Sequence, residues 1–137
     1  MEEENRRMIE MALDARKNSY VPYSNFRVGA CLQTDSGEFY TGCNIENAGY
    51  TATNCAERTA FFKAVSEGKK KFRKIAIMGG HQDGELDFCP PCGVCLQVMM
   101  EFCNPETFQI ILGNSNGDCK VLLLKELLPM GFGPKNL

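Results

Sequence analysis

Apolar residues near the N-terminus recur at the spacing of an amphipathic helix. The positions i, i+3, i+4 and i+7 form one apolar face, made of Met8, Met11, Ala12 and Ala15. The pattern predicts a helix over residues 2–19, and Pro22 follows its end, where a helix rarely continues. We expect this helix to pack against the rest of the domain through that face.

The pattern then changes to the two-residue period of β-strands. Apolar residues alternate over residues 26–34, a turn follows at Asp35-Ser36-Gly37, and residues 38–44 return as a second strand, which predicts a hairpin. Residues 45–54 show no period and are expected to form a loop over the candidate site described below. Three more strands are predicted, two of them fully buried, at residues 75–79, 108–113 and 119–123.

Helical patterns separate these strands. One helix is predicted over residues 56–67, with small residues at four-residue steps and Gly68 at its end; two others are predicted over residues 94–102 and 125–128. The basic run at residues 69–74 is interpreted as a solvent-exposed connection, with a phosphate- or RNA-binding patch as the alternative, and residues 81–87 as a polar loop. Strands that alternate with helices indicate one layered α/β domain over residues 1–137, with a mixed sheet.

Composition narrows the class of protein. The chain has 137 residues, of which 44% are hydrophobic and 23% charged, as in an ordinary soluble domain. Its net charge of −2 argues against nucleic acid as a partner. No apolar run reaches the roughly 18 residues of a membrane span, and the acidic N-terminus is unlike a signal peptide. We therefore expect a cytoplasmic protein that binds neither nucleic acid nor membrane.

Eight cysteines could indicate a disulfide scaffold, but they fall in predicted strands and at helix starts. Reduced thiols and a metal site fit this placement better. Four of the cysteines are expected to act as small buried hydrophobic residues: Cys31, Cys43, Cys103 and Cys119.

The candidate chemistry lies in two motifs, Cys55-Ala56-Glu57-Arg58 and Pro91-Cys92-Gly93-Val94-Cys95. Their three thiols lie at predicted helix N-termini, where the helix dipole favours thiolate. Three protein ligands leave the fourth position of a tetrahedral zinc open, as a catalytic zinc requires, and zinc lowers the pKa of water from about 15.7 to about 7. Glu57 is a candidate for moving protons to and from that water, and Arg58 could offset the excess negative charge of three thiolates.

A closed structural zinc site is the main alternative. Cys89 precedes Cys92 by three residues and could complete a four-thiol site, which would have no open position. Pro90 and Pro91 stiffen the chain between these two thiols, and a structural site gives Glu57 no role. His81, the only histidine, could replace a thiol as a metal ligand, but no second ligand lies near it at a suitable spacing. We expect it to be exposed in a loop.

The cysteine motifs resemble those of the zinc nucleoside and nucleobase deaminases. Four further stretches resemble the small homotetrameric cytidine deaminases, so that the resemblance covers nearly the whole chain: Pro22-Tyr23-Ser24-Asn25-Phe26, Val28-Gly29-Ala30, Gly42-Cys43-Asn44-Ile45-Glu46-Asn47 and Leu127-Leu128-Pro129. The resemblance implies a three-layer α/β/α fold with a five-stranded mixed sheet, one Zn²⁺ per chain, and a homotetramer whose active sites are shared between subunits.

The resemblance also implies an activity, the hydrolytic deamination of free cytidine and deoxycytidine. Water activated by zinc attacks C4 of the base, while Glu57 takes its proton, delivers it to N3 and later protonates the departing ammonia. The zinc ligands would be Cys55, Cys92 and Cys95. A blasticidin-type or other small nucleoside deaminase is the alternative within this class, and a non-catalytic zinc module is the alternative outside it.

Substrate-binding residues follow from the resemblance in the same way. Phe26 would stack on the pyrimidine, and Asn44 and Glu46 would bind the ribose hydroxyls, because an amide and a carboxylate suit a diol. From the residues alone, Phe26 could equally be a core residue, and Asn44 and Glu46 could be turn residues at a strand end. Further members of the implied binding set are Ile45, Tyr50, Ala56 and, from a neighbouring subunit, Phe132.

One departure from the family is visible at Leu96, where many members have arginine. A position on the helix surface could accommodate this change. If the arginine helps to balance charge, Arg58 has a larger share of that role in this chain.

Overall fold

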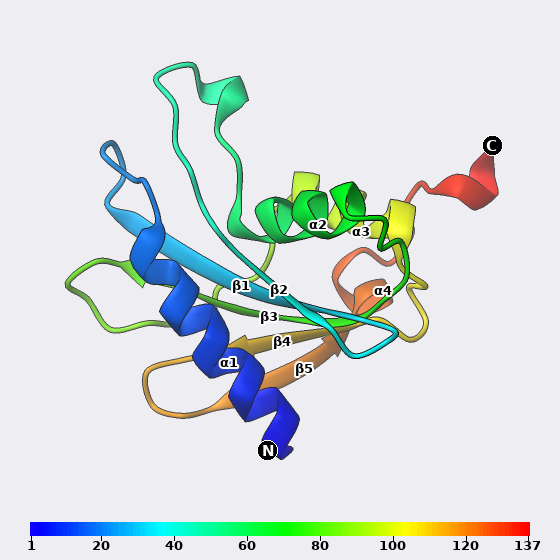
Figure 1. Ribbon diagram of the computed structural model, residues 1–137, viewed down its shortest axis with the longest axis horizontal. Helices are drawn as coiled ribbons and strands as arrows, with labels where there is room; N and C mark the ends of the chain where they lie inside the picture. Colours follow the sequence, from blue (N-terminus) through cyan, green and yellow to red (C-terminus); the bar gives the residue numbers. More distant parts are fainter.

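A mixed sheet of five strands forms the centre of the computed structural model, which describes residues 1–137 (Figure 1). The strands are β1 (Phe26–Thr34), β2 (Phe39–Cys43), β3 (Phe72–His81), β4 (Gln109–Gly113) and β5 (Cys119–Leu123). Their order is β2-β1-β3-β4-β5, with β3 and β4 parallel and the other neighbours antiparallel. The predicted five-stranded mixed sheet is confirmed.

Helices cover both faces of this sheet, so the three-layer α/β/α prediction is also confirmed. Helix α1 (Glu3–Ala15) lies on one face, and helices α2 (Ala56–Ser66) and α3 (Gly93–Phe102) lie on the other (Figure 1). The short helix α4 (Leu124–Leu127) follows β5 directly. Three single turns of 3₁₀-helix were not predicted: Arg16–Asn18, Tyr50–Ala52 and Pro134–Asn136. None of the helices combines the length and the apolar character needed to cross a membrane.

Successive side chains of β3 point to opposite faces of the sheet, so its apolar residues belong to two separate hydrophobic clusters. Ile75 and Ile77 point towards α2 and α3, whereas Ala76 and Met78 join the cluster under α1. All four side chains are buried. The prediction that this strand is buried on both faces is therefore confirmed, because each face has its own helical layer.

The basic run at residues 69–74 was predicted to be a solvent-exposed connection, and this is correct only for part of it. Strand β3 begins at Phe72, so the second half of the run is strand, and Lys74 is buried rather than solvated. Its ammonium group lies 2.7 Å from Glu4 Oε1 and 2.7 Å from Asn5 Oδ1, both on α1. A buried lysine is tolerated when its charge is paired in this way. Only a contact between distant parts of the chain supplies that pairing.

Close packing against β2 fixes the position of α2. A Cβ atom on Gly42 would lie 2.5 Å from the carbonyl oxygen of Ala56 and 2.6 Å from the amide nitrogen of Ala60. Ala56 and Ala60 at this contact, and Ala64 one turn further along the helix, are fully buried, as their four-residue spacing predicts. The start of α2, with its cysteine motif, is thus held directly against the sheet.

Residues 45–54 form the predicted loop, but only Glu46 of this segment lines the cleft that contains the cysteine motifs, so the expected loop over the site is found only in part. The two sides of the loop pair with each other, since Ile45 and Asn54 exchange two backbone hydrogen bonds of 2.9 Å. The segment stands away from the sheet, with its 3₁₀ turn at the far end (Figure 1). Tyr50 on that turn is 86% exposed.

Candidate metal centre and active site

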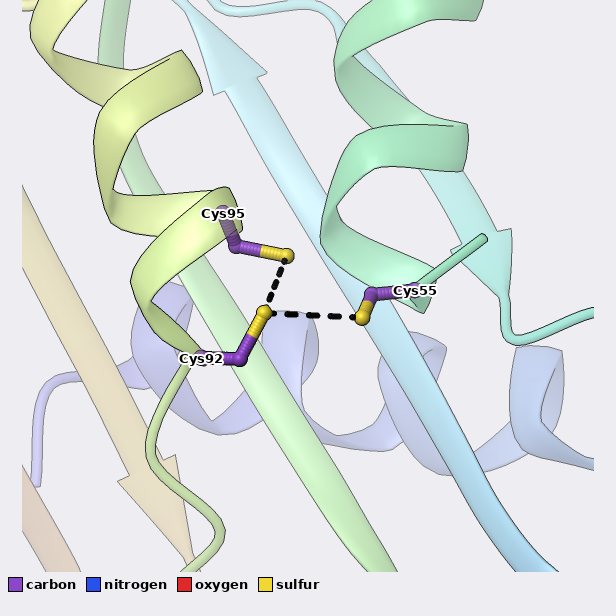
Figure 2. A group of neighbouring side chains, drawn as sticks. All are labelled: Cys55, Cys92 and Cys95. Carbon is purple, nitrogen blue, oxygen red and sulfur yellow. Dashed lines mark hydrogen bonds between the residues drawn. The ribbon is translucent and has the colours of Figure 1, made fainter. Parts of the chain in front are cut away.

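Two helix N-termini bring the three thiols of the sequence motifs together (Figure 2). Cys55 is the N-cap residue of α2, Cys92 is the N-cap residue of α3, and Cys95 lies in the first turn of α3. Their sulfur atoms all lie within 4.8 Å of one another. The unpaired N–H groups and the dipole at both helix ends favour negative charge at this point.

The sulfur positions fit a zinc ion. The separations are 3.7 Å between Cys55 Sγ and Cys92 Sγ, and 3.6 Å between Cys92 Sγ and Cys95 Sγ. Zn–S bonds of about 2.3 Å at tetrahedral angles place two sulfurs about 3.8 Å apart. Two of the three sulfur separations therefore match those of tetrahedral zinc ligands, and all three sulfurs lie within 4.8 Å of one another.

Cys89 is not part of this group of sulfur atoms. Its Sγ instead packs against β3, where it lies 2.8 Å from the position that a Cβ of Gly79 would occupy. The closed four-thiol alternative therefore has no support in the geometry. All eight cysteines are free thiols in this structure.

Arg58 contacts the thiol group directly. Its Nη2 donates a hydrogen bond of 3.3 Å to Cys55 Sγ, and its buried Nε has no hydrogen-bond partner. Hydrogen bonds from Cys95 and from Arg58 lower the pKa of Cys55 to about 5. A partly buried guanidinium beside three thiols is compensated when the thiols are ionised, which is also the form that binds zinc.

Glu57 lies in the first turn of α2, two residues after Cys55, and is only 4% exposed. Burial raises its pKa to about 7. A carboxyl group with such a pKa can both accept and release a proton near neutral pH. The position is fixed by the first turn of α2, which the contact with Gly42 holds in place.

A cleft of about 340 Å³ opens beside the thiols and Glu57. Its volume is at the lower end of the range usual for small-molecule sites, about 300–1,000 Å³. The lining comes from β1, the end of β2, the start of α2 and the segment before α3: Ser24, Phe26, Val28, Asn44, Glu46, Cys55, Ala56, Glu57, Cys89, Pro90 and Cys92.

Four of the predicted substrate-binding residues line this cleft, namely Phe26, Asn44, Glu46 and Ala56. Three others do not line the cleft of their own chain: Ile45, Tyr50 and Phe132. The backbone of Ile45 pairs with that of Asn54 across the loop. Phe132 lies on the C-terminal tail and is 57% exposed. Gln97 Nε2 on α3 holds this tail by donating a hydrogen bond of 2.8 Å to the Phe132 carbonyl.

The cleft also contains residues to which the sequence assigned no role. Ser24, Val28 and Pro90 belong to the lining. Ser24 was inside one of the family-like stretches, and its hydroxyl was the available signal. Val28 and Pro90 gave no chemical signal, because both present only apolar surface.

Asn44 and Glu46 are bonded to the backbone of their own chain. Asn44 Oδ1 accepts a hydrogen bond of 2.9 Å from the Val28 amide, and its Nδ2 donates one of 2.8 Å to the Phe26 carbonyl. Glu46 Oε1 accepts hydrogen bonds of 3.0 and 3.2 Å from the amides of Tyr23 and Ser24. Both side chains therefore fasten the segment that precedes and begins β1.

Two other sites were predicted less accurately. His81 is exposed as expected, but it is the last residue of β3 rather than part of a loop, and its ring packs edge-on against Phe26 with 5.2 Å between centroids. Leu96 is not on the helix surface, because it is 8% exposed and belongs to the main hydrophobic core. An apolar residue at that position is buried by α3 packing on the sheet.

Comparisons with known proteins agree with this site. The family model described as the cytidine and deoxycytidylate deaminase zinc-binding region matches residues 2–111. A curated cytidine deaminase of Sporosarcina psychrophila is 45% identical over 131 residues, which are 96% of this chain and 93% of that protein. A cytidine deaminase of Halalkalibacterium halodurans is 45% identical over 130 residues, 95% of each chain.

Solved structures give the same result. The crystal structure of a cytidine deaminase from Burkholderia pseudomallei has a TM-score of 0.83 and 44% identity, and covers 96% of this chain and 100% of that chain. A cytidine deaminase from Mycobacterium tuberculosis has a TM-score of 0.78 and 35% identity, with 93% and 96% covered. The chain therefore belongs to the zinc-binding cytidine and deoxycytidylate deaminase family.

Proposed function

We propose that this chain hydrolyses free cytidine and deoxycytidine to uridine and deoxyuridine with release of ammonia, and that residues 1–137 act as one catalytic domain. The observation that supports this most directly is the convergence of three thiols and a buried carboxyl group, Glu57, at one small cleft. A structural zinc site would need neither the cleft nor the buried acid.

The ligands of the metal in this proposal are Cys55, Cys92 and Cys95. A zinc ion held by these three thiolates would supply a water of lowered pKa. As the water oxygen adds to C4 of the base, Glu57 would accept one of its protons and deliver it to N3. Glu57 would then carry the second water proton, from the hydroxyl now on C4, to the amine, which leaves as ammonia when its C–N bond breaks. Its pKa of about 7 suits both directions of transfer. Arg58 offsets part of the thiolate charge through its contact with Cys55.

The nucleoside lies in the cleft with its base towards the thiols. Phe26 stacks on the pyrimidine, and the main chain at Ala56 holds the edge of the base. Asn44 and Glu46 receive the sugar hydroxyls. All four residues line the cleft, on the side of β1 and β2 that faces the start of α2.

The active enzyme is a homotetramer in this proposal, with each site completed by neighbours. Tyr50 and Phe132 are exposed on segments that extend away from the sheet (Figure 1). In one chain neither reaches the cleft, so a neighbouring subunit is the route by which they would enclose substrate. We also place the enzyme in the cytoplasm, since its eight free thiols suit a reducing compartment.

The test is the loss of ultraviolet absorbance when cytidine is incubated with the zinc-loaded protein. Glu57→Gln should keep one zinc per chain and lose about 10²–10⁴ in rate, the usual contribution of a general acid–base group. Glu101→Gln, a change at an exposed acid on α3, is the matched control and should be silent. A panel with deoxycytidine, cytosine and blasticidin S assigns the substrate class. Near-normal turnover by Glu57→Gln would contradict the assigned role.

A further inference from the structure

The turn that precedes β1 is held in one conformation by its own hydrogen bonds. Asn25 lies in the left-handed region with φ of 58°, and its amide donates a hydrogen bond of 3.1 Å to the Val21 carbonyl. Asparagine is one of the few residues that adopt this conformation readily. The turn presents Ser24 to the cleft, where its side chain is exposed.

The Ser24 hydroxyl lies between two groups of the proposed nucleoside site. It accepts a hydrogen bond of 3.0 Å from the Phe26 amide, and it donates its own proton to Glu46 Oε2. The direction of the second bond is determined, because an ionised carboxylate can only accept. The Phe26 amide therefore orients the hydroxyl, and the hydroxyl orients the carboxylate.

The Glu46 carboxylate has few acceptor positions left for further hydrogen bonds. A carboxylate offers about four acceptor positions. The amides of Tyr23 and Ser24 occupy Oε1, and the Ser24 hydroxyl occupies one position on Oε2. One acceptor position remains for a donor from a ligand, and its direction is set by the bond to Ser24.

We infer that Ser24 is a positioning residue for the sugar of the nucleoside, acting by orienting the free acceptor position of Glu46. The inference rests on the proposed function, since it needs a sugar in this cleft. Without the Ser24 hydroxyl, Glu46 Oε1 keeps its two amide donors, but Glu46 Oε2 loses the one protein donor that fixes its orientation. The effect should therefore fall on substrates that offer a sugar hydroxyl to Glu46 and should spare those that do not.

The experiment compares cytidine with 2′,3′-dideoxycytidine, which has the same base but lacks the 2′ and 3′ hydroxyls of the sugar. For Ser24→Ala we expect KM for cytidine to rise about tenfold, as for one hydrogen bond to a charged group, with kcat changed less than about twofold. The constants for the dideoxy substrate should stay unchanged. Ser24→Thr keeps the hydroxyl and should restore KM for cytidine.

A matched control exists in the β1–β2 turn, where the Ser36 hydroxyl donates a hydrogen bond of 2.8 Å to Glu38. Ser36→Ala removes an equivalent serine–glutamate bond away from the cleft and should leave all constants unchanged. Ser24→Cys, which preserves side-chain size, repeats the test if the alanine variant has a lowered melting temperature.

Three outcomes would overturn the inference. Equal losses on both substrates would mean that Ser24 supports the pocket in general. A lower KM for cytidine in Ser24→Ala would mean that the hydroxyl competes with the sugar, and unchanged kinetics would mean that it has no part in binding. In all three cases the wild-type chain still deaminates cytidine, whereas a wild-type chain without that activity would refute the proposed function and this inference together.

Discussion

Replacing Gly42 by alanine tests whether the contact between β2 and α2 places the active site. The added Cβ would lie 2.5 Å from Ala56 O and 2.6 Å from Ala60 N, and Cβ contacts below 3.0 Å essentially do not occur in proteins. Both contacted atoms belong to the helix backbone, so a side-chain rotation cannot relieve the overlap. The start of α2 must move away from the sheet by about half an ångström or more.

Two consequences of different size follow from that movement. Overpacking at a buried contact costs about 1–3 kcal/mol of unfolding free energy, or about 3–10 °C in melting temperature for a chain of this length. The activity should suffer as well, because Cys55 and Glu57 move with α2 while Cys92 stays with α3. Since an error of about 1 Å can cost about 10²-fold in rate, we expect a loss of about tenfold in kcat.

The measurements are thermal unfolding, zinc content and cytidine turnover of the same preparation. Gly84→Ala is the control, because an alanine Cβ there meets only His81 atoms at 3.8 and 3.9 Å, which is ordinary contact. It should leave all three quantities unchanged. If Gly42→Ala melts and turns over like the wild type, the contact does not set the position of α2, and our account of how the site is held is wrong.

Three further predictions test the ligand set, a buried ion pair and the shared site. Cys89→Ser should keep about one zinc per chain, whereas alanine at any of the three proposed ligands should remove metal, as measured by elemental analysis. Lys74 lowers the pKa of Glu4, so their pair contributes stability that is present above the pKa of an unfolded glutamate, about 4.3, and is lost as pH falls through the lower folded value. Glu4→Gln should therefore cost about 0.5–1 kcal/mol in urea unfolding at pH 7, after solvent screening, and the difference should shrink below about pH 4. Co-refolded Glu57→Gln and Phe132→Ala chains should show more activity than the sum of the two refolded apart; strictly additive activity, with hybrids verified by native mass spectrometry, would contradict a shared site.

The thiol group could be predicted from sequence because its determinants are local. The two motifs begin helices, and the N-cap positions of Cys55 and Cys92 follow from their places just before the helical pattern. Only the meeting of the two helix ends required the fold. The family resemblance supplied that part, and the structure agrees with sulfur separations of 3.6 and 3.7 Å.

The errors occurred where a distant contact decides local structure. Lys74 belongs to a run that resembles a solvated connection. Nothing nearby in the sequence shows that Glu4 will pair with its charge, or that Asn5, 69 residues away, will accept a hydrogen bond from it. A position on the helix surface was expected to accommodate Leu96 in place of the family's arginine, yet Leu96 packs into the core. Neither the partner of a buried charge nor the facing side of a short helix can be obtained from spacing alone.

For Asn44 and Glu46, the two interpretations that compete in the sequence are compatible with each other. From the residues alone they were either turn residues or sugar ligands, and the structure bonds both to the backbone around β1. Those bonds do not oppose a role in binding. A side chain that is already fixed loses little rotamer freedom when a ligand arrives, and hydrogen bonds from Ser24 and Tyr23 hold the pKa of Glu46 low, so that it stays an acceptor. The same bonds that fasten the turn therefore prepare an ionised, oriented carboxylate at the cleft.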